Sequence, residues 1–240
     1  MRIKSSHKPT RVAIIGCQHG NEHIGRRVFK YYEHRLADYP GLTIILANEE
    51  AIAAGKRCID ADMNRSFPGN PSGNHEERLA AELLPIVREA EYVLDLHTTS
   101  CEVGMVPIVA NVEAGVRRVI NLTGRRDIVL MKPGIAGASL IGNVGVGVSL
   151  EFNEQYAASP DAIDEVEVII GGLLNQQQNK EAERYIYAVD ATIPLKTVLG
   201  ANDDNFTYSR KLQAYPFLLH EREYTQHQGF LAKTRQRKFI

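Results

Sequence analysis

The chain lacks the features of a secreted or membrane-spanning protein. Its three cysteines show no CxxC spacing, which argues against a disulfide framework and fits reduced thiols. No apolar run approaches the roughly 20 residues that a membrane span requires, and residues 1–10 lack the apolar segment of a signal peptide. We therefore expect a soluble, cytoplasmic protein with no membrane partner.

The chain also lacks an excess of charge of either sign. Lysine plus arginine (28) nearly cancels aspartate plus glutamate (29), so no global field draws the protein to nucleic acid or to an anionic membrane. A small molecule or a peptide is the partner that this balance favours. The length of 240 residues suits one sizeable domain with at most a small appendage.

Apolar, β-branched runs alternate with segments of helical spacing along most of the chain. Strands are predicted over residues 11–16, 41–48, 92–97, 106–110, 127–131 and 146–152, and helices after Asn21 and over 75–90, 112–122 and 160–175. This order predicts an α/β fold, in which a mostly parallel or mixed central sheet carries helices on both faces.

The composition changes near residues 175–184, which are polar. Beyond them, alternating tyrosines and β-branched residues indicate a small β-rich appendage. We therefore predict two domains, an α/β domain over residues 1–180 and a C-terminal domain over 181–240.

Polar residues gather where the predicted strands end, which is where open α/β sheets bind ligands. His19 and Glu22 follow the first strand and His97 closes the strand at 92–97. Three ligands from His and Glu with one position left for water are typical of catalytic zinc, so these residues form a candidate metal site. Asp95, two residues before His97, lies on the same side of the strand and is placed to orient the imidazole. The pair His19 and Glu22 alone is equally compatible with a solvated helix start.

Two further places carry residues suited to catalysis. The loop at 56–73 holds Arg57, Asn64 and Arg65, a combination that suits recognition of a carboxylate and stabilisation of an oxyanion, although a solvated loop is the alternative. Its apolar residues favour a packed loop. Glu151, in an apolar strand, is either a salt-bridge partner or a general base whose pKa is raised by desolvation. Cys17 is interpreted as a small core residue instead of a metal ligand.

Four motifs in order resemble the aspartoacylase and succinylglutamate desuccinylase family of the zinc carboxypeptidase superfamily. They are "GCQHGNEHIG", "RCIDADMNRSFPG", "DLHTTS" and "SLEFNEQY", and "AYPFLLHEREY" extends the likeness toward the C-terminus. The resemblance implies a zinc-carboxypeptidase-like fold with one Zn²⁺ per chain. It also implies a zinc-dependent amidohydrolase that cleaves an N-acyl amino acid into a carboxylate and an amino acid. The first substrate that it implies is N-acetyl-L-aspartate. A homodimer is implied by the resemblance alone.

The resemblance also implies a role for each matching residue. The zinc ligands would be His19, Glu22 and His97, the base Glu151, the carbonyl-polarising group Arg57, and the groups that bind the substrate Asn64, Arg65 and Tyr224. A tyrosine on a sheet surface is the alternative for Tyr224.

The chain departs from aspartoacylases in one respect. They place an arginine shortly before the catalytic glutamate to bind the side-chain carboxylate of N-acetylaspartate, but between Met131 and Leu150 this chain has only Lys132 as a cation. The alternatives are therefore a succinylglutamate desuccinylase, a carboxypeptidase-like hydrolase, or a non-catalytic zinc-binding protein.

Overall fold

The computed structural model describes residues 1–6, 9–177 and 180–240. Within them, ten strands form one sheet in the order β1-β3-β2-β4-β7-β5-β6-β8-β10-β9. The strands are β1 (Arg2–Ser5), β2 (Val12–Gly16), β3 (Leu42–Leu46), β4 (Tyr92–Thr99), β5 (Met105–Val109), β6 (Asp127–Met131), β7 (Gly147–Asn153), β8 (Glu183–Pro194), β9 (Tyr215–Phe217) and β10 (His227–Phe239).

Helices connect these strands. They are α1 (His23–Tyr32), α2 (Glu49–Ala54), α3 (His75–Val87), α4 (Ala114–Thr123), α5 (Pro133–Ala136), α6 (Glu154–Ala158) and α7 (Pro160–Leu174), with short 3-10 turns η1 (Leu36–Asp38), η2 (Met63–Arg65) and η3 (Leu140–Gly142). The strands and helices expected in the α/β part are all present, with ends that differ by at most three residues. The strand β4 runs two residues past His97, because Thr98 and Thr99 still pair with β7.

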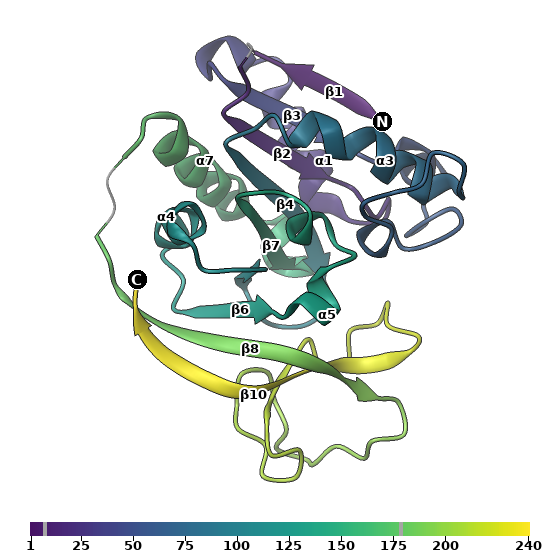
Figure 1. The fold of residues 1–240 in the computed structure, drawn as a ribbon, viewed down its shortest axis with the longest axis vertical. Coiled ribbons are helices and arrows are strands. Elements are labelled where there is room, and N and C mark those ends of the chain that lie inside the picture. Colours follow the sequence, from purple (N-terminus) through teal and green to yellow (C-terminus); the bar gives the residue numbers. More distant parts are fainter. Residues whose placement is uncertain (7–8, 178–179) are drawn as a thin grey trace.

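The sheet is mixed, as predicted, and helices cover both of its faces (Figure 1). Strands β3, β2, β4 and β7 are parallel, whereas β5 runs antiparallel to β7. Alternate residues of β2 serve the two faces: Val12 and Ile14 pack with α1, while Ala13 and Ile15 pack with α3. This is the period of two that buries both faces of a strand.

The C-terminal residues extend the same sheet. β8 pairs in parallel with β6, and β10 pairs antiparallel with β8, so the two long strands run side by side along one end of the molecule (Figure 1). They are rich in β structure, as expected. The division of the chain at residue 180 stays a prediction. The strands after it also enclose an apolar cluster with β5, β6 and α5.

Candidate active site

The first two candidate ligands are placed by the turn between β2 and α1. Glu22 is the N-cap residue of α1, so its carboxylate lies at the positive end of the helix. Gly16 and Gly25 touch, because a Cβ on Gly16 would lie 2.4 Å from the Cα of Gly25. Gly20 packs as closely against the backbone of α2, which explains why this loop tolerates no side chain there. The loop is thereby folded over the end of the strand.

The third candidate ligand, His97, and the candidate base, Glu151, come from adjacent parallel strands. His97 on β4 is paired in register with Glu151 on β7, so their side chains lie on the same face of the sheet. Asp95, two residues earlier on β4, shares that face, and the Nε2 of His97 lies 2.8 Å from its Oδ2. The predicted orienting contact is therefore confirmed.

His19, Glu22 and His97 form a tight, buried cluster. The Nδ1 of His19 lies 2.6 Å from one carboxylate oxygen of Glu22, and the Nδ1 of His97 lies 3.2 Å from the other. One possible ligand atom from each residue lies within 4.8 Å of the others. Burial acts to raise the pKa of Glu22, but the two imidazoles outweigh it and lower this pKa to about 2. The carboxylate is therefore ionised at neutral pH, as a metal ligand requires.

The far nitrogen of each imidazole is held by a second carboxylate. His19 presents Nε2 to the Oδ1 of Asp62 at 2.9 Å, as His97 does to Asp95. With these nitrogens protonated, both Nδ1 atoms are left as lone-pair donors directed toward Glu22. The Oε2 of Glu22 is buried and accepts no well-aligned hydrogen bond from a described residue. Two imidazole nitrogens and a carboxylate oxygen with a free lone pair fit a Zn²⁺ ion.

The loop between α2 and α3 carries the candidate substrate groups, and it is packed in large part. Met63 and Phe67 are buried, as expected for a packed loop, whereas Ile59 is 38% exposed. Glu76 of α3 is fully buried and accepts hydrogen bonds from three successive backbone N–H groups of residues 59–61. This buried carboxylate fastens the loop to α3.

Each of the three loop residues has a defined position. Arg57 forms an ion pair of 3.0 Å with Asp62 and lies 3.8 Å from Glu22. The side-chain oxygen of Asn64 accepts from the backbone N–H of Leu140, so its amide nitrogen is turned toward the pocket, 3.3 Å from Nε2 of His97. Arg65 forms no ion pair with any described residue.

Glu151 is the carboxylate best suited to exchange a proton. Burial raises its pKa to about 7, with the charges of Glu22 and Glu221 adding to the effect. Within the described part of the chain it has no salt-bridge partner, which leaves the carboxylate free to act as a base.

Cys17, by contrast, is fully buried in the apolar cluster under α1, and burial raises its pKa to about 12. Its interpretation as a core residue is confirmed.

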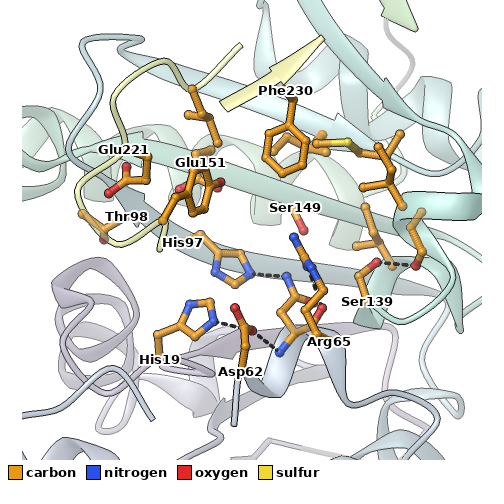
Figure 2. A pocket seen from close by; sticks show the side chains of 18 of the residues that line it. His19, Asp62, Arg65, His97, Thr98, Ser139, Ser149, Glu151, Glu221 and Phe230 are labelled. Carbon is orange, nitrogen blue, oxygen red and sulfur yellow. Dashed lines mark hydrogen bonds and ion pairs between the residues drawn. The ribbon is translucent and has the colours of Figure 1, made fainter. Parts of the chain in front are cut away.

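All eight residues to which the family resemblance assigns a role line one pocket. Figure 2 shows His19 and Asp62 on one side of it and Phe230 on the other. Tyr224 lies in the loop between β9 and β10, and its ring contacts that of His227 at a tilt of 46°, with ring centroids 4.4 Å apart. The C-terminal segment therefore closes the pocket opposite the His–Glu–His cluster.

Three residues that support the candidate site were not singled out from the sequence. Asp62 holds His19, Gln18 donates to Asp95 at 2.7 Å, and Glu221 accepts from the backbone N–H of Ser100 at 2.8 Å. Asp62 stands in the motif that contains Arg57, and its N-cap position at η2 was the available signal. Glu221 joins segments 121 residues apart in the chain, and no local pattern predicts that contact.

The sheet and the site define the class of protein. A buried pair of histidines with a carboxylate at the carboxyl edge of an α/β sheet, beside a second carboxylate, is an arrangement typical of metal-dependent hydrolases. Solved structures share the fold. Murine aminoacylase 3 matches 96% of this chain and 97% of its own, with a TM-score of 0.73 and 21% identity. The structure of succinylglutamate desuccinylase from Chromobacterium violaceum covers 98% of this chain and 86% of its own, with a TM-score of 0.67 and 18% identity.

Residues 8–177 match the succinylglutamate desuccinylase/aspartoacylase catalytic domain. The chain belongs to this family, and the resemblance seen in its motifs is confirmed. A probable aspartoacylase of Acaryochloris marina is 33% identical over 113 residues, 42% of this chain and 38% of that protein. An N-acyl-aromatic-L-amino acid amidohydrolase of Rattus norvegicus is 32% identical over 120 residues, again 42% and 38%. The alignments thus span about two fifths of these relatives. The relatives are named as amide hydrolases.

Proposed function

We propose that this protein is a zinc-dependent amidohydrolase that splits an N-acyl amino acid into a carboxylate and a free amino acid. The observation that carries the proposal is the register of β4 and β7, which sets Glu151 beside a His–Glu–His cluster suited to Zn²⁺. A site that only bound metal would need neither this base nor Arg57. The family of the chain and the names of its relatives support the same chemistry.

The metal's contribution follows from its charge: bound Zn²⁺ lowers the pKa of a coordinated water toward ~7 and polarises a carbonyl. Glu151 would accept a proton from the attacking water and deliver it to the departing amine. A pKa of about 7 suits both steps, because the carboxylate takes up and gives back a proton at neutral pH.

The guanidinium and amide groups of the loop would position the substrate. Arg57, held by Asp62, is placed to donate to the scissile carbonyl as negative charge develops on its oxygen. Asn64 and Arg65 would hold the α-carboxylate, because Arg65 forms no ion pair with a described residue and Asn64 turns its amide nitrogen into the pocket. Tyr224 would close over the substrate from the C-terminal loop.

The proposal is tested on purified protein by metal analysis and a substrate panel. The panel contains N-acetyl-L-aspartate, which the family resemblance implies first, N-succinyl-L-glutamate and C-terminal peptides as the alternatives, and further N-acetyl amino acids. We expect one zinc per chain and release of a free amino acid that a chelator abolishes. A zinc-loaded protein that hydrolyses no amide in the panel would refute the proposal.

Two variants and one control separate catalysis from metal binding. Glu151→Ala should abolish turnover with zinc content unchanged, whereas His19→Ala should lose both. The matched control is His34→Ala, whose side chain is 81% exposed, and it should lose neither. Unchanged turnover in Glu151→Ala would remove the proposed base and favour a role in binding alone.

A further inference from the structure

The pocket has an apolar half that the catalytic residues do not use. Its wall consists of side chains from β5, β6, α5, η3, the segment after β9 and β10: Ile108, Met131, Ile135, Ile141, Leu218 and Phe230. All but Ile135 are less than 8% exposed, because they belong to the apolar cluster beneath the C-terminal strands. We call these six residues the apolar wall.

Two serine hydroxyls next to this wall already donate within the protein. The hydroxyl of Ser139 donates to the carbonyl of Ala136 at 2.7 Å, a bond that Figure 2 shows, and the hydroxyl of Ser149 lies 3.3 Å from Asp95. Neither hydroxyl proton is left to donate to a carboxylate of a ligand. The wall therefore offers a bound molecule little beyond burial of apolar surface.

Apart from Arg65, the described chain offers this half of the pocket no unpaired cation. Lys132 follows Met131 in sequence, but it is 51% exposed, pairs with Asp190 at 3.0 Å and does not line the pocket. The arginines of the pocket are Arg57, which is paired with Asp62, and Arg65. Among the arginines of the described pocket residues only Arg65 has a guanidinium that lacks an ion-pair partner, so the pocket can pair one carboxylate of the substrate.

Position shows which part of the substrate meets the apolar wall. Asn64, a proposed ligand of the α-carboxylate, is hydrogen-bonded to the backbone of Leu140, so it adjoins η3, where Ile141 begins the wall. With the α-carboxylate bound there, the amino-acid side chain on the α-carbon would lie against the apolar wall. The acyl group would then point the other way, toward Thr98 and Glu221.

On this basis we propose that the enzyme selects N-acyl amino acids with an apolar side chain and discriminates against aspartate and glutamate derivatives. An acidic side chain would bury a second carboxylate against the apolar wall without a charged partner, which is unfavourable. This inference rests on the proposed function, and it names the side-chain class that the function leaves open.

The test compares kcat/KM for the N-acetyl derivatives of glycine, leucine, methionine, phenylalanine, aspartate and glutamate with zinc-loaded enzyme. We expect at least about a 100-fold preference for the best apolar substrate over N-acetyl-L-aspartate. Equal or higher activity on N-acetyl-L-aspartate would overturn this inference while leaving the proposed function intact. Failure to hydrolyse any of the six would instead count against the proposed function.

Two variants test the wall itself. Ile141→Arg introduces the missing cation and should raise the aspartate-to-leucine ratio of kcat/KM by about 100-fold. Lys132→Ala is the matched control and should leave that ratio unchanged; a fall in it would mean that Lys132 serves the pocket after all, against the inference.

Because Ile141 is buried, a gentler variant is needed in case the arginine prevents folding. Phe230→Ala should lower the kcat/KM for N-acetyl-L-leucine about tenfold more than that for N-acetylglycine, which has no side chain. Acyl chains of different length on glycine should respond equally to this variant. If instead the response follows the acyl chain, the wall binds the acyl group and the proposal is wrong.

Discussion

The buried carboxylate of Glu76 gives the sharpest prediction about the loop that carries Arg57 and Asn64. One oxygen accepts from the side-chain nitrogen of Asn48 at 3.0 Å and from a backbone N–H at 2.7 Å, and the other accepts from two backbone N–H groups at 2.9 Å each. Glu76 is 0% exposed, so no water can replace these donors.

The change Glu76→Gln keeps the size of the side chain but leaves only one acceptor oxygen. In either orientation two of the four hydrogen bonds are lost, and the new NH₂ group faces two donors. Hydrogen bonds to a charged acceptor contribute about 1.5–3 kcal/mol each, so the free energy of unfolding should fall by about 3–6 kcal/mol. With an m value of about 3 kcal/mol/M, the urea midpoint should fall by roughly 1–2 M.

Urea unfolding followed by circular dichroism measures this change, with Glu82→Gln on the exposed side of the same helix as the control. Burial acts to raise the pKa of Glu76, but the hydrogen bonds from the backbone N–H groups outweigh it, so this pKa is lowered in the folded state. Its contribution is therefore present at neutral pH and is lost as the pH falls through the lowered pKa, so the two variants should converge in acid. Equal midpoints at neutral pH would show that the carboxylate does not hold the loop.

Three further predictions concern the site itself. Asp62→Asn should weaken zinc binding by about 10–100-fold, measured by chelator competition, because it loosens His19; unchanged affinity would exclude that role. Since burial raises the pKa of Glu151 to about 7 and the base must be ionised, kcat/KM should rise with pH through that value, and a rate that is flat from pH 5.5 to 8 would contradict it. Glu221→Gln should raise KM more than it lowers kcat, because it releases the loop that bears Tyr224; an effect on kcat alone would place Glu221 in the chemistry.

Much of the fold could be predicted because its signals are local. The strand β2 is a continuous apolar run and β4 and β7 are mostly apolar, as expected for strands buried on both faces, and their order with the intervening helices implies the α/β class. The antiparallel insertion of β5 beside β7 could not be predicted, because strand order depends on packing between segments distant in the chain. For the same reason, β8 and β10 gave no sign that they would extend the central sheet.

The same division holds within the site. His19 and Glu22 are three residues apart, and Asp95 and His97 are two apart on one strand, so chain geometry alone brings each pair together. The sequence by itself therefore determined these two pairs and pointed to the candidate ligand set, whereas the parallel pairing of β2 with β4 brings His97 to Glu22. Only the tertiary structure decided that Asp62 holds His19, that Glu221 ties the C-terminal loop to β4, and that six separate segments form the apolar wall. These contacts depend on where the folded chain brings distant side chains together, which no local spacing records.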